Sequence, residues 1–172
     1  MLLPELSAIG WFHTLGSLPA IPLSLWLLAR HGRIPPGTRL GKAWLVFMFI
    51  GALSGVLVIK SPPGVAISIL SIGSLVTGSL IGKIAARWKH RWWIETVALS
   101  TATFTLFLPS FTEILTRLPA GAPIAASPEA PLVVSIQLSL LLLLIAAIVL
   151  QLTVMRARLK RAIYGWTGVR SE

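Results

Sequence analysis

Cysteine and aspartate are both absent from the 172 residues. Without cysteine, the chain has no disulfides and no thiolate metal ligands. Glutamate supplies all five carboxylates, and there are only three histidines. The sequence has no GxSxG, P-loop or HExxH motif, and its residues assemble no set of nucleophile, base and orienting group. The sequence therefore favours a non-catalytic protein.

Charge is also scarce, while apolar residues are abundant. Charged residues make up 12% of the chain, against about 25% in an ordinary soluble domain. Hydrophobic residues make up 55%, which is more apolar surface than a soluble fold of this length can bury. The composition therefore predicts a protein of the lipid bilayer.

The apolar residues fall into five spans, each near the roughly 20 residues that a helix needs to cross a membrane. The spans are residues 6–29, 43–59, 65–81, 92–115 and 131–155. They are continuously apolar instead of alternating, which favours helices over the strands of a membrane barrel. The N-terminal MLLPELSAIGW has no basic segment and contains Glu5, so we do not expect a cleaved signal peptide. We predict an all-α integral membrane protein with residues 1–172 in a single membrane domain.

The basic residues predict the orientation of these spans. Three segments hold 13 of the 15: Arg30, Arg33, Arg39 and Lys42; Lys83, Arg87, Lys89 and Arg91; and Arg156, Arg158, Lys160, Arg161 and Arg170. Only Lys60 and Arg117 fall in the other connections. Basic residues favour the cytoplasmic side. Five crossings then place the N-terminus outside and residues 156–172 inside as a basic cytoplasmic tail, in a bacterial inner membrane.

Tryptophans accompany the basic residues where the fourth span begins, in the stretch ARWKHRWWIET of residues 86–96. Trp88, Trp92 and Trp93, together with Trp166 in the tail, suit the headgroup level, because the indole ring is apolar and its N–H is polar. The basic residues lie in separate segments beside spans, so we interpret them as topology signals and lipid contacts and expect no nucleic-acid binding. The tail, read as a helix, is expected to lie along the headgroups.

Small residues predict where the helices approach each other. Gly51 and Gly55 form one GxxxG spacing, and Ser74, Gly78 and Gly82 follow at steps of four. The fifth span is mostly leucine, so we expect it to lie at the periphery of the other four. Kinks are expected at Pro19 and Pro22 in the first span and at Pro109 in the fourth.

Few polar side chains lie inside the spans. Those in the predicted outer half are His13, Thr14, Ser110, Glu113 and Gln137. Such groups tend to face a bundle interior, a partner or a ligand. His13 either makes a structural hydrogen bond or binds a cofactor, such as haem or another tetrapyrrole. Glu95 and Glu113 are expected to pair with arginines four residues away, Arg91 and Arg117.

Three elements resemble a family of predicted polytopic bacterial membrane proteins of unknown function. They are His13 in the first span, the segment TRLGKAW of residues 38–44, and His90-Arg91-Trp92-Trp93. The resemblance covers residues 9–115 and implies a helical membrane protein whose histidines could form a haem or metal site. Thr38 stands where the family has its second histidine, and Glu113 stands where an arginine is expected.

Three functions are consistent with these observations. The first is a non-catalytic accessory subunit that packs against other membrane subunits of a respiratory or photosynthetic complex. The second is a b-type haem or other tetrapyrrole protein that uses His13 as a ligand. The third is a small transporter, although five spans do not divide into the paired repeats common in transporters.

Overall fold

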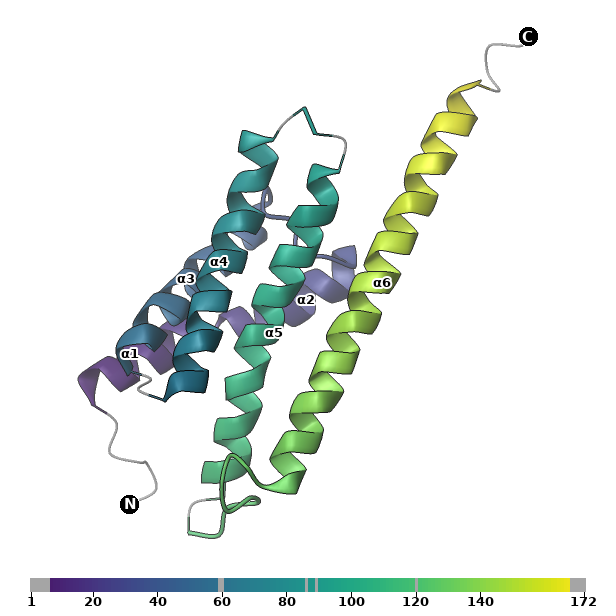
Figure 1. Cartoon of the computed structure of the whole chain (residues 1–172). Helices are drawn as coiled ribbons and strands as arrows, with labels where there is room; N and C mark the ends of the chain where they lie inside the picture. The colour runs from purple at the N-terminus through teal and green to yellow at the C-terminus, as the bar shows by residue number, and fades with distance from the viewer. Residues whose placement is uncertain (1–6, 59–60, 86, 89, 120, 168–172) are drawn as a thin grey trace.

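The computed structural model describes residues 7–58, 61–85, 87–88, 90–119 and 121–167, without the side chains of residues 160 and 162–167. All regular structure in these residues is α-helical. The helices are α1 (Ala8–Ser17), α2 (Ala20–His31), α3 (Arg39–Val58), α4 (Pro62–Ile84), α5 (Arg91–Arg117) and α6 (Pro131–Thr167), drawn in Figure 1.

Five helical stretches of the described chain are long and apolar enough to cross a membrane, which confirms the predicted number of spans. The first is the pair α1 and α2, which together cover Ala8–His31. The fifth continues as one helix past the predicted end at Met155. Ala157, Arg158 and Leu159 are strong helix formers, and the described tail thus extends the span. The structure shows no separate tail helix before Thr167 that lies across the end of the span.

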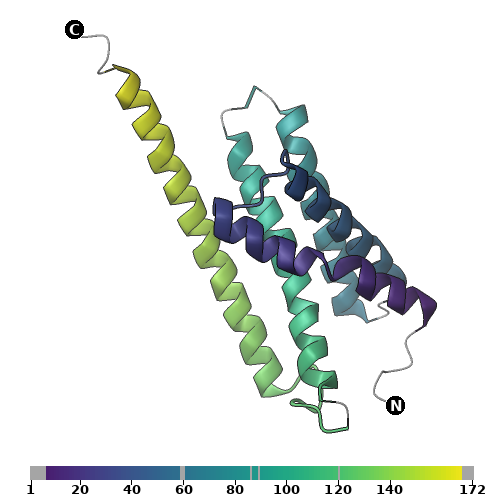
Figure 2. The ribbon, with the colours of Figure 1, turned by 180° about the vertical axis from the view of Figure 1, so that it is seen from behind.

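The first span is broken at Leu18 and Pro19, which lie between α1 and α2. Proline has no N–H to donate to the preceding turn. Figure 2 shows the two halves running obliquely across the bundle, inclined to α5. The expected interruption of this span is therefore present at Pro19. Pro22 lies within the first turn of α2, and Pro109 lies inside the continuous helix α5.

The connection between α2 and α3 is closed by local contacts. Gly32 ends α2 with a left-handed φ of 69°, and its N–H donates to the Leu28 carbonyl. The hydroxyl of Thr38 accepts a bond of 3.0 Å from the Gly41 N–H. A side chain at Gly41 would overlap the Pro35 carbonyl, because the loop folds back against the start of α3. These residues explain why α3 begins at Arg39, one turn earlier than the sequence predicted.

Helices α3, α4 and α5 pack side by side in the centre, with α1 and α2 against α3 and with α6 against α5 (Figures 1 and 2). Trp44, Leu75, Leu99 and Ala102 are almost completely buried in this core. Only 6% of the most apolar window of α6 is buried, against 39% for α3 and for α5. The peripheral position expected for the fifth span is therefore confirmed.

Small residues bring two pairs of helices close together. A side chain at Gly51 would lie 2.8 Å from Cβ of Ser17, between α3 and α1. One at Gly78 would lie 2.5 Å from Cδ2 of Leu99, between α4 and α5. Gly55 is buried on α3, while Ser74 is partly exposed on α4. The small-residue positions therefore predicted close approaches at Gly51 and Gly78.

Candidate functional site

His13 joins α1 to α3. Its Nδ1 lies 2.9 Å from the hydroxyl oxygen of Ser54. That hydroxyl has a single hydrogen, which it donates to the Ile50 carbonyl at 2.5 Å. With that hydrogen directed to Ile50, the Ser54 oxygen is available to accept from His13 when the imidazole proton is on Nδ1. In that tautomer Nε2 carries the lone pair.

The other predicted outer-half groups do not join His13 in one set of hydrogen bonds. The amide of Gln137 on α6 donates to the hydroxyl of Thr112 on α5, at 3.0 Å. Ser110 donates to a carbonyl of its own helix, and Glu113 pairs with Arg117 as expected. Thr14 is exposed. Of the predicted cluster, only His13 and Gln137 make contacts between helices, at the α1–α3 and α5–α6 interfaces.

At the other end of the bundle, the predicted pair of Glu95 and Arg91 is wrong. Glu95 pairs with Arg33 of the α2–α3 loop at 2.9 Å, and its side chain is only 16% exposed. Arg91 instead donates to the Gly82 carbonyl in the last turn of α4, at 3.1 Å. Arg91 is engaged by that carbonyl, and the α2–α3 loop brings Arg33 beside Glu95 in its place.

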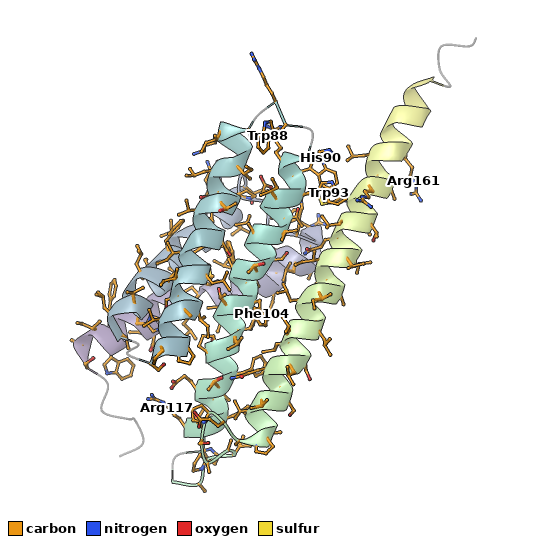
Figure 3. The ribbon with its side chains drawn as sticks, in the orientation of Figure 1. Trp88, His90, Trp93, Phe104, Arg117 and Arg161 are labelled. Atoms are coloured by element: carbon orange, nitrogen blue, oxygen red, sulfur yellow. The ribbon has the colours of Figure 1, made fainter. Side chains whose placement is uncertain are left out.

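Trp93 lies at this same end and faces α6, as Figure 3 shows. The guanidinium carbon of Arg156 lies 3.8 Å from the centre of the Trp93 ring, over its face. The ring also contacts Trp92 and the edge of His90. We call the end that holds these contacts and the Arg33–Glu95 pair the basic end of the bundle. Arg33 of the first basic segment, Arg91 of the second and Arg156 of the third all lie at this end.

The tryptophans predicted as interfacial anchors have different environments. Trp88 is 63% exposed, as an anchor at the headgroup level requires. Trp93 is instead covered by Arg156, and its buried Nε1 has no hydrogen-bond partner among the described residues. The side chain of Trp166 lies outside the described part. The anchor prediction therefore fits Trp88 best, whereas Trp92 and Trp93 are half-buried.

Polar contacts that the sequence did not predict join α5 to α6. The hydroxyl of Ser100 donates to Oε1 of Gln151 at 2.8 Å, and both residues are buried. The Thr96 hydroxyl lies 3.5 Å from the Met155 sulfur. Together with Thr112–Gln137 and Trp93–Arg156, these contacts keep one antiparallel register along the interface. The sequence signal for this interface was the presence of two glutamines on an otherwise leucine-rich span, because a polar side chain in a membrane helix tends to bond to a neighbouring helix.

A buried tryptophan forms the other unpredicted contact. Trp44 is 0% exposed, and its Nε1 donates to the Ser24 hydroxyl at 2.6 Å. Ser24 passes its own hydrogen to the Ala20 carbonyl. Trp44 lies one turn inside α3, close enough to the span end to resemble an anchor in sequence. Its position in the core follows from the packing of α2 on α3.

Among the described residues, no group of three His, Cys, Asp or Glu side chains is placed to hold a metal ion. Comparisons with protein-family models, curated proteins and solved structures give no match to the chain. The resemblance carried by His13, residues 38–44 and residues 90–93 thus stays a prediction. The segment of residues 38–44 has a structural role, since Gly41 and Trp44 pack the start of α3.

Proposed function

We propose that this chain is a non-catalytic subunit of a larger membrane complex and that α6 is its attachment to the partner subunits. The observation that carries the proposal is the division of α6 into two faces. One face holds Gln137, Gln151 and Met155 against α5. A second face, turned away from α5, holds Leu138, Leu142, Ile145 and Val149, each more than half exposed.

The fixed register of the α5 contacts supports this function. Hydrogen bonds at both ends of the α5–α6 interface hold α6 in one rotation, so the same four apolar side chains always face outward. A helix held in one rotation presents a constant surface, which suits a specific neighbour. Respiratory and photosynthetic complexes are the class of partner that we propose.

The proposed setting is a bacterial inner membrane with the basic end in the cytoplasm. The contacts Arg33–Glu95, Arg91–Gly82 and Arg156–Trp93 draw the three basic segments toward one end of the bundle. That clustering supports the orientation predicted from charge, because basic residues resist translocation. The chain then begins outside and ends inside.

Co-purification from native membranes tests the proposed attachment. We expect the wild-type chain, solubilised in mild detergent, to migrate with partner subunits in one assembly. Leu142→Trp should release it, because the larger ring disturbs a protein contact, whereas lipid accommodates it. Leu57→Trp is the matched control, since Leu57 is 70% exposed on α3 and should keep the assembly intact. Migration of the wild-type chain as a lone 18.5 kDa species would sink the proposal.

A haem or other tetrapyrrole protein is the second candidate, and the contact between His13 and Ser54 favours it. A ligating histidine commonly donates its second ring N–H to a neighbouring group, and the Ser54 hydroxyl oxygen, 2.9 Å from Nδ1 of His13, is placed to accept such a bond. Nε2 of His13 is then the nitrogen with a free lone pair. An apolar groove of about 500 Å³ beside Ser54, lined by Phe12, Ile50 and Leu53, supplies apolar surface for a ring.

A visible absorption spectrum of the purified protein tests this candidate. We expect a Soret band after expression with sufficient haem, lost in His13→Leu and kept in His90→Leu. His90 is exposed at the basic end, so its removal leaves the environment of His13 unchanged. A wild-type spectrum without that band, or equal loss in both variants, would contradict a role for His13 as a ligand.

A further inference from the structure

A second groove lies on the outer surface between α4 and α5. Gly73, Ser74, Ala98 and Thr101 are small and leave it hollow, with Ile69 toward one end and Trp93 at the other. Its volume is about 680 Å³, and it is open along its length. The lining is mostly apolar, so within a membrane the groove is filled by a lipid chain or by another helix.

The groove is longer than the hydrocarbon of one leaflet. Trp93 is near the start of α5 at the basic end, and Ile69 lies on α4, fifteen residues before the helix ends at Ile84. Fifteen helical residues span about 22 Å. Half of a hydrocarbon core of about 30 Å is about 15 Å. An acyl chain that enters from the basic end therefore fits within the groove.

The basic end of the groove carries a positive charge. Arg156 lies over the Trp93 ring, and its N–H donors lie in the guanidinium plane, which leaves them available to a phosphate. Among the described residues, no carboxylate pairs with Arg156. Arg91 lies two residues from Trp93 and uses one of its donors on the Gly82 carbonyl. A phosphate can pair with these cations, whereas an apolar partner helix offers them no opposite charge.

We propose that the α4–α5 groove binds an acyl chain of one anionic phospholipid whose phosphate contacts Arg156. The lipid belongs to the leaflet at the basic end. Trp93 lies between the two parts of the site, the cation and the apolar groove. Its ring face contacts the guanidinium of Arg156, and the residue also lines the groove. Arg156 comes from α6, so the bound lipid also holds the end of α6 against α5. This inference is independent of the proposed subunit function, because it concerns a different face of the molecule.

Photo-crosslinking tests the proposed site. The full-length protein is reconstituted with phosphatidylglycerol or phosphatidylcholine that carries a diazirine on one acyl chain, and the labelled peptides are identified by mass spectrometry. We expect phosphatidylglycerol to label the groove segments of α4 and α5 about fivefold more than phosphatidylcholine does. Uniform labelling of all spans, or equal labelling by both lipids, would overturn the proposal.

Two variants separate the headgroup contact from the groove. Arg156→Gln should abolish the preference for phosphatidylglycerol, whereas Arg158→Gln should keep it, because Arg158 is exposed on another side of α6. Gly73→Leu should remove the groove labelling by both lipids, since nothing lies within 4 Å of an added Cβ and the side chain can fill the groove without a clash. Ala146→Leu adds the same bulk on α6 and should label like the wild type.

The variants also define the results that contradict the site. If Arg158→Gln loses the preference as fully as Arg156→Gln does, the effect is general surface charge and no site exists. If Gly73→Leu labels like the wild type, the lipid does not occupy the groove. If Gly73→Leu releases a co-purifying protein while lipid labelling is unchanged, a partner helix occupies the groove and the proposal is wrong. Size-exclusion elution at the wild-type position shows that each variant is folded.

Discussion

The indole N–H of Trp44 depends on a single hydroxyl for its hydrogen bond. Ser24 accepts it at 2.6 Å, and both side chains are completely buried. A buried donor that loses its partner costs more than the bond itself contributes, because the donor cannot reach water instead. Loss of this contact between α2 and α3 should therefore cost more free energy than one hydrogen bond contributes.

We expect Ser24→Ala to lower the free energy of unfolding by about 1–2 kcal/mol. The measurement is reversible unfolding in mixed micelles with increasing SDS. Ser68→Ala is the control: Ser68 is also buried, but its hydroxyl donates only to the Gly64 carbonyl within α4, so its removal orphans no donor.

The background Trp44→Phe completes this experiment. Phenylalanine has no N–H, so Ser24→Ala in that background should cost much less than in the wild type. An equal cost in both backgrounds would show that the hydrogen bond contributes nothing and that Ser24 acts by packing alone.

At the scale of the helices, two glycines inside helices have different surroundings. Gly51 on α3 lies against Ser17 of α1, where an added Cβ would be 2.8 Å from Cβ and 3.7 Å from Cα of the serine. Gly73 on α4 has open space at the same position. Since relief at Gly51 needs movement of the α1 backbone, the two substitutions should differ in sign.

Gly51→Ala should therefore destabilise the protein by about 1–3 kcal/mol. Gly73→Ala should be neutral or stabilise by up to about 1 kcal/mol, because alanine is the better helix former. Both values come from the same SDS titration. Equal effects at the two positions would mean that α1 does not pack against α3 at Gly51.

At the scale of the whole molecule, the charges are asymmetric. The three basic segments approach each other through the Arg33–Glu95, Arg91–Gly82 and Arg156–Trp93 contacts, while the opposite end holds the Glu113–Arg117 pair. The α5–α6 connection at that opposite end has no lysine or arginine between Leu118 and Pro131. The whole bundle therefore has one end suited to the cytoplasm and one suited to translocation.

Reporter fusions measure this orientation directly. A reporter that is active only in the cytoplasm should be active when fused after Glu172 and silent when inserted in residues 121–127. The inverse pattern would reverse the proposed orientation. Activity at both sites would mean that the number of crossings differs from five.

The sequence alone was sufficient to predict the five spans and the peripheral position of the fifth span in the bundle. Spans are local, since about 20 consecutive apolar residues suffice to cross a membrane. The break at Pro19 and the close approaches at Gly51 and Gly78 also follow from residue type, because proline lacks a donor and glycine lacks a side chain. The placement of His13 and Gln137 at two different interfaces did not follow, since their spacing says nothing about which helices are neighbours.

Only the tertiary structure decided which partner each polar group takes. Arg91 is one helical turn from Glu95, so the sequence favours that pair, yet Glu95 binds Arg33, 62 positions away. Trp93 has the residue type and the position near a span end that are typical of a lipid anchor, but the register of α6 places Arg156 over its ring. The continuation of α6 beyond Met155 likewise determines where that arginine lies. An apolar span is determined locally, because each consecutive segment gains free energy by transfer into lipid. The partner of a polar group is determined by which helices pack together, and that packing depends on contacts between residues distant in sequence.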